Sequence, residues 1–266
     1  MLVGTVNAEL VRGHGTMAVV FVERLSVERE LLSDEELGQW PFTIPCVDAI
    51  LRDGLELRRP VTFLVGENGS GKSTLVEAIA EAAGLDARGG RAGRKYGNQR
   101  PLTRLGEVMR LGLTREGAQM RLRTRNKRKG YFLRAETLFG LAEVVSGLPG
   151  YWPEDLSSIS HGEGFLAVFQ AMFSEPGLYL MDEPEAALSF RSCLELVALM
   201  HDLGRSGAQV ICATHSPILA STPEADIVEA GDFGLRRVAW ADLAITDHWR
   251  RYLADPAAYL RHLIDP

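Results

Sequence analysis

An α/β architecture, with helices flanking a mostly parallel sheet, is the fold that the sequence predicts. Short apolar runs rich in β-branched residues, such as 60–65 and 208–214, have the character of buried strands. Stretches with apolar residues at helical spacing alternate with such runs, and strands that alternate with helices form parallel sheets. A length of 266 residues, 46% of them hydrophobic, is sufficient for a large core.

The first half of the chain contains the clearest succession of elements. Residues 17–24 alternate in polarity and predict a strand, and residues 60–65 predict a second strand that ends at Gly66. Apolar residues recur at helical spacing over 73–83, and Gly84 follows at the position where glycine ends helices. Strand, glycine-rich loop and helix therefore form one continuous unit.

The middle of the chain has a different composition. Residues 84–130 are rich in Gly and Arg, and regular structure resumes over 131–145 as a strand that enters a helix. We therefore expect one domain over 1–266 that carries a basic accessory lobe, antiparallel or helical, at about 85–150.

The second half continues the alternation of helices and strands. It predicts, in order, a helix at 161–173, a strand at 177–181, an amphipathic helix at 185–203, a strand at 208–214, a strand including 227–229 and a helical tail at about 240–266.

Composition excludes several classes of protein. No stretch reaches the roughly 20 apolar residues of a membrane-spanning helix, and Glu9, Arg12 and Glu23 interrupt any signal-peptide pattern. The three cysteines form no C-x-x-C pair and are too few for a disulfide framework. We expect a cytoplasmic protein that does not insert into membranes.

Residues 66–73, Gly-Glu-Asn-Gly-Ser-Gly-Lys-Ser, fit the phosphate-binding pattern G-x-x-x-x-G-K-[S/T]. Glycines let backbone N–H groups surround phosphate oxygens, the lysine brings a positive charge, and the hydroxyl is a ligand for Mg²⁺. The guanine-reading sequence N-K-x-D is absent, which favours ATP over GTP. The predicted contacts to ATP come from Gly66, Glu67, Asn68, Gly69, Ser70, Gly71, Lys72, Ser73 and Thr74.

Further polar residues follow two of the predicted strands. Asp182 and Glu183 end an apolar run, where Asp182 and Ser73 are placed to bind the metal and Glu183 to polarise a water molecule. His215 ends the strand at 208–214, at the same sheet edge, and we expect it to contact the γ-phosphate. An acid pair alone is typical of a strand exit, and a lone histidine of packing. Their coincidence with the phosphate loop favours catalysis.

The order of these motifs, with Ser160-His161-Gly162-Glu163-Gly164 between them, resembles the ABC-type ATPase head. In that family Lys72 and Ser73 would belong to the Walker A motif, Asp182 and Glu183 to Walker B, and His215 to the H-loop. The resemblance implies a P-loop NTPase fold, ATP and Mg²⁺ as ligands, and catalytic roles for Lys72, Glu183 and His215.

Ser160, Gly162 and Glu163 fall at the position of the family's signature motif. A serine among glycines at the start of a helix is a second anion site, and in this family it completes the nucleotide site of the partner subunit. The resemblance thus implies a homodimer that forms on ATP binding, with 185–189 at the D-loop between subunits. Without the other motifs, Ser160 would be interpreted as a helix N-cap.

The chain departs from transporter heads, whose signature reads Leu-Ser-Gly-Gly-Gln. Its Ser-His-Gly-Glu form is similar to stand-alone bacterial ATPases related to SMC and repair-type ATPases. No glutamine stands at the Q-loop, where Arg134 or Glu136 takes its place. Trp40 and Phe42 either stack on adenine or are buried in a loop.

The net charge of −6 hides an uneven distribution. Residues 88–134 hold 15 Lys and Arg against two acidic residues, a net charge of +13, and the remainder carries −19. This segment binds DNA or RNA, meets an acidic protein partner, or is a solvated hairpin. The residues expected to contact nucleic acid are Arg121, Arg123, Arg125, Lys127, Arg128 and Lys129.

Together these observations predict an ATP-hydrolysing ABC-type ATPase that works as a nucleotide-sandwich dimer, coupled to nucleic-acid maintenance or defence. Two alternatives stay open, namely the ATPase subunit of an ABC transporter and an ATP-driven switch that regulates an unidentified protein partner.

Overall fold

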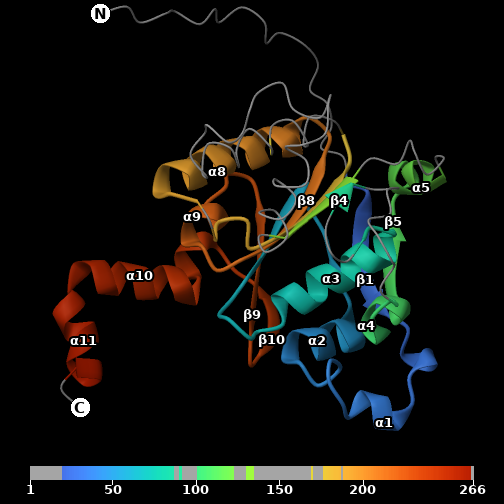
Figure 1. The fold of residues 1–266 in the computed structure, drawn as a ribbon, viewed down its shortest axis with the longest axis horizontal. Helices are drawn as coiled ribbons and strands as arrows, with labels where there is room; N and C mark the ends of the chain where they lie inside the picture. Colours follow the sequence, from blue (N-terminus) through green and yellow to red (C-terminus); the bar gives the residue numbers. More distant parts are fainter. Residues whose placement is uncertain are drawn as a thin grey trace, which may run out of the picture.

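A computed structural model describes residues 20–86, 90–91, 101–122, 130–134, 169, 176–186 and 188–264. Two sheets organise this part of the chain (Figure 1). The larger sheet has seven strands, which lie side by side in the order β10 (Gly234–Arg237), β9 (Asp226–Gly231), β3 (Val61–Val65), β8 (Gln209–Thr214), β7 (Leu178–Asp182), β6 (Gly130–Arg134) and β4 (Gly90–Arg91).

The central strands of this sheet, from β9 to β6, are parallel. Only the edge strands described, β10 and β4, pair in the antiparallel sense. All residues of β3, β7 and β8 are buried, as expected for parallel strands that are covered on both faces. The predicted fold class is confirmed, and the strands expected at 60–65, 177–181 and 208–214 begin within one residue of their predicted positions.

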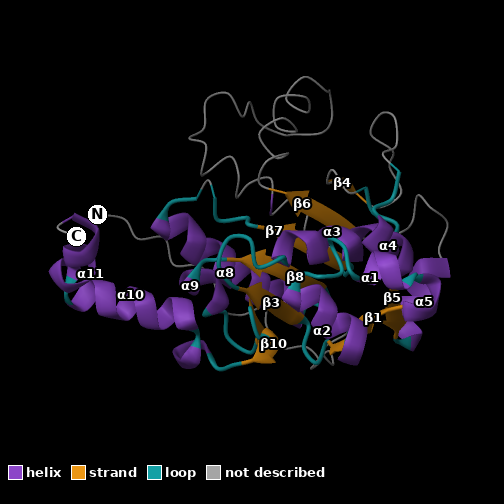
Figure 2. Cartoon of the chain, turned by 90° about the horizontal axis from the view of Figure 1, so that it is seen from below, coloured by secondary structure: helices purple, strands orange, loops and turns teal. Residues whose placement is uncertain are grey.

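Eleven helical segments are described. They are η1 (Arg29–Leu31), α1 (Asp34–Leu37), α2 (Pro45–Asp53), α3 (Lys72–Ala83), α4 (Arg104–Val108), α5 (Arg115–Leu122), α8 (Phe190–Arg205), α9 (Pro217–Ala220), η4 (Trp240–Asp242), α10 (Ala244–Ala254) and α11 (Pro256–Ile264). Figure 2 shows α10 and α11 at one end of the molecule and α5 at the other.

The core has two parts, one on each face of the large sheet. Alternate residues of one strand belong to different parts, since Leu64 joins the cluster under α2 and α3, and Phe63 joins the cluster under α8. This follows from the alternation of side chains along a strand. The two clusters hold the carboxyl ends of β3, β7 and β8 at one common edge.

The smaller sheet is antiparallel, with β1 (Val22–Val27) between β2 (Leu55–Glu56) and β5 (Met109–Leu113). The strand predicted at 17–24 is therefore placed too early, and residues 17–19 lie outside the described part. The strand continues beyond Arg24 because Leu25 and Val27 are buried in the core and pair with Leu111 and Met109 of β5. This pairing joins segments that are distant in sequence, so a local alternation does not reveal it.

Part of the basic segment packs against the body of the protein. Leu105 and Val108 of α4, and Met109 of β5, are buried in the same core cluster as α3. The Glu81 carboxylate of α3 accepts hydrogen bonds from the Thr103 backbone N at 3.0 Å and from the Thr103 hydroxyl at 2.5 Å. Residues 101–122 are thus tied to the helix that follows the phosphate loop.

The helix predicted at 185–203 begins later, at Phe190. Ser189 is its N-cap, and the Ser189 hydroxyl accepts a hydrogen bond from the Ser192 backbone N at 3.2 Å. Serine is favoured at this position because it satisfies an N–H group that has no partner within the helix. The turn around Glu185 is instead held by contacts to β8, described below.

Candidate active site

The loop of residues 66–71 connects β3 to α3 at the carboxyl edge of the sheet. Gly69 and Gly71 have φ angles of +84° and +90°, a region that favours glycine. A Cβ atom on Gly71 would lie 2.5 Å from Ile44 Cγ2 and 2.6 Å from Cys46 Sγ. The glycines of the motif are therefore required by both backbone conformation and close packing.

Lys72, the first residue of α3, is almost fully buried, with 3% of its surface exposed. Its Nζ donates hydrogen bonds to the Glu67 carbonyl at 2.8 Å and to the Ser70 hydroxyl at 3.4 Å, so the ammonium lies inside the loop. Burial lowers the pKa of Lys72, while the charges of Glu183 and Asp182 act in the opposite direction. A buried ammonium inside a glycine-rich loop at the start of a helix fits the phosphate oxygens of a nucleotide.

Ser73 and Asp182 lie together, as expected for two ligands of one metal ion. The Ser73 hydroxyl donates to Asp182 Oδ1 at 2.8 Å. Both groups offer oxygen atoms, the donors that Mg²⁺ prefers, and Mg²⁺ sites commonly combine one or two protein ligands with substrate phosphates. In the part of the chain described, no group of three His, Cys, Asp or Glu residues is arranged to hold a metal. The pair therefore fits a Mg²⁺ ion that is shared with a phosphate.

Glu183 adopts an unusual backbone conformation directly after β7. Its φ is +49°, and its backbone N donates to the Ala213 carbonyl at 2.9 Å. Non-glycine residues with positive φ are uncommon and often occur at functional sites. The Glu183 carboxylate is partly exposed, and its Oε1 lies 3.6 Å from His215 Nδ1. The structure thus brings together the predicted base and the predicted histidine.

Glu185 is a functional candidate that was not predicted in this role. Its side chain is buried, and its Oε1 accepts hydrogen bonds from the His215 backbone N at 3.0 Å and from the Thr214 hydroxyl. The same oxygen lies 3.5 Å from His215 Nδ1. The expectation that residues 185–189 lie between subunits stays a prediction, and within one chain the Glu185 carboxylate points inward at the turn after β8. The sequence did contain a signal for this role, because Glu185 follows the acid pair closely in the run Asp-Glu-Pro-Glu.

Arg134 ends β6 next to the predicted metal ligands. Its Nε lies 3.8 Å from Asp182 Oδ2, and its Nη1 lies 3.6 Å from Glu77 Oε2. Of the two residues expected in place of the Q-loop glutamine, Arg134 is thus adjacent to Asp182. Glu136, the other candidate, lies outside the described residues.

The two aromatic residues upstream of the loop have different environments. Phe42 is buried in the core cluster under α2 and α3, with 3% of its surface exposed, so stacking of Phe42 on adenine is excluded. Trp40 is 70% exposed.

Several predicted residues lie outside the described part of the chain. These are Ser160, Gly162 and Glu163 of the signature, and Arg123, Arg125, Lys127, Arg128 and Lys129 of the basic run.

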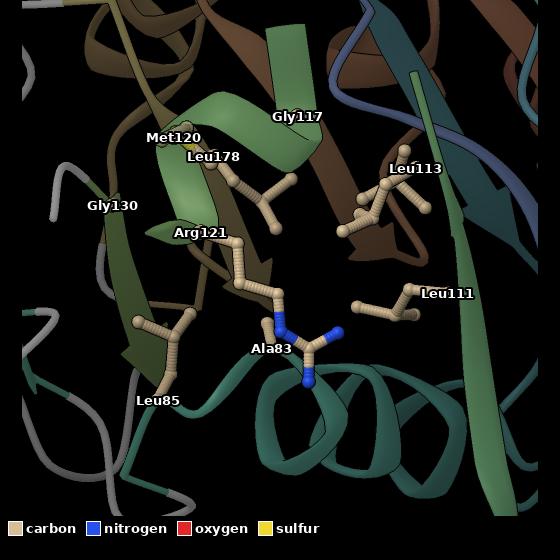
Figure 3. A pocket seen from close by; sticks show the side chains of 10 residues that line it. Ala83, Leu85, Leu111, Leu113, Gly117, Met120, Arg121, Gly130 and Leu178 are labelled. Atoms are coloured by element: carbon tan, nitrogen blue, oxygen red, sulfur yellow. The ribbon is translucent and has the colours of Figure 1, made fainter. Parts of the chain in front are cut away.

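Arg121 belongs to the last turn of α5. It lines a small cavity of about 40 Å³ with apolar residues that include Leu85, Leu111 and Leu113, and Figure 3 shows its side chain pointing across the cavity toward α3. A cavity of this size admits little more than one water molecule. We therefore assign no organic ligand to it.

Comparison with known families gives two adjacent matches. A family model described as "AAA domain" matches residues 52–154, and a model described as "AAA domain, putative AbiEii toxin, Type IV TA system" matches residues 153–221. The two matches together include the phosphate loop, the acid pair and His215.

Curated relatives extend over most of the chain. An aliphatic sulfonates import ATP-binding protein of Streptomyces avermitilis is 30% identical over 216 residues, covering 79% of this chain and 80% of that protein. A protein of the same description from Nocardia farcinica is 33% identical over 214 residues, covering 79% of this chain and 82% of the relative. A Clostridium perfringens component of an ABC transporter complex superposes with a TM-score of 0.42 and 16% identity, covering 80% of this chain and 90% of that chain.

Among the helices described, none has the length and apolar character needed to cross a membrane.

Proposed function

Because this chain belongs to the ABC-type ATPases, we propose that it binds ATP with Mg²⁺ at residues 66–74 and hydrolyses the γ-phosphate through Glu183. The 2.8 Å hydrogen bond between Ser73 and Asp182 carries this proposal, because it joins the phosphate loop to the acid pair at one sheet edge. Bound Mg²⁺ would neutralise charge on the phosphates from Ser73 and Asp182.

The other residues at this edge of the sheet have separate roles in hydrolysis. Lys72 supplies positive charge to the β- and γ-phosphates, and Glu183 accepts a proton from the attacking water molecule. His215 contacts the γ-phosphate, and Glu185 positions His215 through its hydrogen bond to the His215 backbone N, 3.0 Å long. Catalysis by this arrangement consists mainly of positioning and charge neutralisation, as is general for phosphoryl transfer.

The active form in this proposal is a homodimer with two ATP molecules between the heads. Ser160, Gly162 and Glu163 complete the site of the opposite subunit. The support for this step is the family to which the chain belongs, together with the exposure of His215 at the active edge. His215 is 43% exposed at this edge, although Glu185 beneath it is buried.

We propose further that ATP hydrolysis is coupled to nucleic acid in maintenance or defence. The support is the net charge of +13 over residues 88–134 in a protein that is otherwise acidic. The description of the family model over 153–221, which refers to a toxin system, is consistent with a role in defence.

A transporter subunit is the second candidate, because the relatives named above are import ATP-binding proteins. Arg134 beside Asp182, in place of a Q-loop glutamine, counts against it. A membrane partner would be required for transport.

The test of coupling is the rate of ATP hydrolysis with and without duplex DNA, at low and at moderate salt. We expect DNA to stimulate hydrolysis at low salt and the stimulation to weaken as salt rises, because phosphate contacts release counterions. Substitution of Arg121, Arg123, Arg125, Lys127, Arg128 and Lys129 by Gln should remove the stimulation and leave the basal rate unchanged. Lys72→Ala gives the background rate of the preparation.

The matched control replaces exposed arginines on other elements, Arg52, Arg58 and Arg191, by Gln. This variant should keep its response to DNA. A rate that does not respond to DNA at either salt concentration would overturn the coupling. A wild-type rate no higher than that of Lys72→Ala would overturn the hydrolytic assignment itself.

A further inference from the structure

A groove with a volume of about 540 Å³ lies between the phosphate loop and the C-terminal helices. One wall is the loop itself, over residues 65–70. A second wall is the end of β9 with the turn that leads to β10, over residues 229–233, and the third is formed by α10 and α11. This volume falls within the range of small-molecule sites, about 300–1,000 Å³. Figure 1 shows α10 and α11 at the side of the sheet where β3 leads into the loop.

The groove and the catalytic residues lie on opposite sides of β3. In the large sheet β3 has β8 and β7 on one side and β9 and β10 on the other. Asp182 ends β7, Glu183 follows it and His215 follows β8, so the γ-phosphate belongs on that side. A triphosphate is a linear chain, and the nucleoside must leave the loop in the other direction, over β9 and β10. The groove lies there.

The groove wall formed by the C-terminal helices is aromatic. It includes His248, Trp249 and Tyr259, and Phe233 of the turn adds a fourth ring from the second wall. Trp249 lines the groove and is 50% exposed, so its indole is accessible to a ligand there. Every nucleobase offers a flat π surface to such a ring.

The turn after β9 brings to the groove a group that suits a sugar better than a phosphate. Asp232 of this turn lines the groove, and a carboxylate repels phosphate groups but accepts hydrogen bonds from hydroxyl groups. The phosphates and the nucleoside therefore have chemically different surroundings on the two sides of the loop.

The aromatic wall is fixed by specific contacts. The Glu229 carboxylate, buried at the end of β9, accepts from the backbone N of Ala244, the first residue of α10, at 2.8 Å. It also accepts from Arg236 Nε at 2.7 Å. His248 Nδ1 and Tyr259 Oη, 2.8 Å apart, connect α10 to α11. A wall held in this way is preorganised, which limits the entropy lost on binding.

We propose that this groove holds the base and sugar of the nucleotide, and that Trp249 of the C-terminal helix α10 stacks on the base. The proposal rests on the proposed function, since it extends the same phosphate site. It assigns to α10 and α11 the recognition of the nucleoside, a role for which Trp40 and Phe42 were the candidates from the sequence.

The test compares ATP with inorganic tripolyphosphate, which has the phosphates but no nucleoside. Dissociation constants are measured by titration calorimetry with Mg²⁺ for the full chain and its variants. Trp249→Ala should weaken ATP binding about tenfold, because loss of one stacked aromatic ring has about this effect. Its affinity for tripolyphosphate should be unchanged. Trp249→Phe should keep most of the ATP affinity, which separates stacking from a loss of folding.

Two control variants complete the design. Leu253→Ala changes an exposed residue of the same helix that does not line the groove, and it should bind ATP as the wild type does. Trp40→Ala should also have no effect. Selective weakening of ATP by Trp40→Ala, with none by Trp249→Ala, would place the base elsewhere and overturn the groove assignment.

Measurements on the wild-type protein alone distinguish failure of the groove assignment from failure of the proposed function. Equal affinity for ATP and tripolyphosphate would overturn the groove assignment and leave the phosphate site standing. Binding of neither ligand would overturn the proposed function, and with it the groove.

Discussion

At the scale of single residues, the buried Glu185 carboxylate organises the catalytic edge. At the turn after β8, its Oε1 accepts hydrogen bonds from the His215 backbone N and from the Thr214 hydroxyl. Its Oε2 is buried and has no hydrogen-bond partner among the described residues. A buried charge that is incompletely paired is costly for folding. We interpret this cost in folding free energy as the consequence of using a buried carboxylate to hold the His215 backbone in place.

Glu185→Gln tests this interpretation. The amide keeps the shape of the side chain and removes its charge, so we expect the unfolding temperature to stay the same or rise. The turnover number for ATP should fall about tenfold, because the variant removes the charge that faces His215 Nδ1, 3.5 Å from Glu185 Oε1, and KM should change little. Steady-state kinetics together with thermal unfolding measures both effects.

The control for this variant is Glu195→Gln, at an exposed i,i+4 pair with Arg191. It should alter neither quantity. A normal turnover number in Glu185→Gln would show that His215 does not depend on Glu185.

At the scale of elements, α1 is held in place by one carboxylate that serves two partners. Glu36 Oε2 accepts from the Ser33 backbone N at 2.8 Å in a capping box, and Glu36 Oε1 accepts from Arg104 Nε at 2.7 Å. Arg104 also donates to the Leu31 carbonyl at 2.6 Å. These contacts join α1 to α4, two short elements that are far apart in the sequence.

The hydrogen bond from Arg104, with those from Ser33, lowers the pKa of Glu36 from 4.5 to about 2. Because the pKa in the folded protein is below the unfolded value, the stabilisation is complete above about pH 4.5 and is lost as the pH falls toward 2. Glu36→Gln should lower the unfolding temperature at pH 7 by about 1–3 °C. This difference should shrink below pH 4.5, as thermal unfolding followed by circular dichroism would measure.

Glu35→Gln is the control, because Glu35 belongs to the same helix but has no contact to α4 among the hydrogen bonds and ion pairs described. A Glu36→Gln difference that stays constant down to pH 3 would contradict the role assigned to the carboxylate.

Elements of the large sheet could be predicted because their signals are local. β3, β7 and β8 are buried on all sides, so an apolar run marks each of them with nearly correct bounds. The helix α2 was not predicted, although Pro45 stands at its first position, where proline is common in helices. The small antiparallel sheet depends on pairing between β1 and β5, which are distant in sequence, and no local pattern specifies that register.

The candidate site was predicted to a similar degree. Lys72, Ser73, Asp182 and Glu183 belong to compact motifs, and parallel strands bring the ends of such motifs to the same edge. The groove wall could not be predicted, because Trp249 is brought beside the phosphate loop by the anchoring of α10 to Glu229. Neither the glutamate nor the alanine of this contact belongs to a sequence pattern that would predict it.

At the scale of the whole molecule, the proposed sandwich dimer can be tested by the effect of ATP on the mass of the protein. We expect Glu183→Gln to lower the ATP turnover number about 10²–10⁴-fold, because the base that takes the proton from water is removed. The variant should still bind ATP, so closed dimers should accumulate when ATP is added. Size-exclusion chromatography with light scattering, with and without ATP, measures this change in mass.

Lys72→Ala serves as the opposite control, since without its ammonium the loop should bind ATP poorly and the protein should remain monomeric at any ATP concentration. Full turnover by Glu183→Gln would remove Glu183 from the role of base. A mass that does not respond to ATP in either variant would contradict the sandwich dimer.

The phosphate loop contacts the end of β9, and the C-terminal helices are attached to the same strand end. A Cβ on Gly66 would lie 2.4 Å from the Ala230 carbonyl oxygen, so the loop backbone lies directly against the end of β9. Glu229, the preceding residue, holds the start of α10. At 1.5 Å per residue α10 is about 16 Å long, and a tilt of about 10° at its base would move its far end by roughly 3 Å. A loop movement that tilts α10 would therefore displace α11 further than it displaces the start of α10.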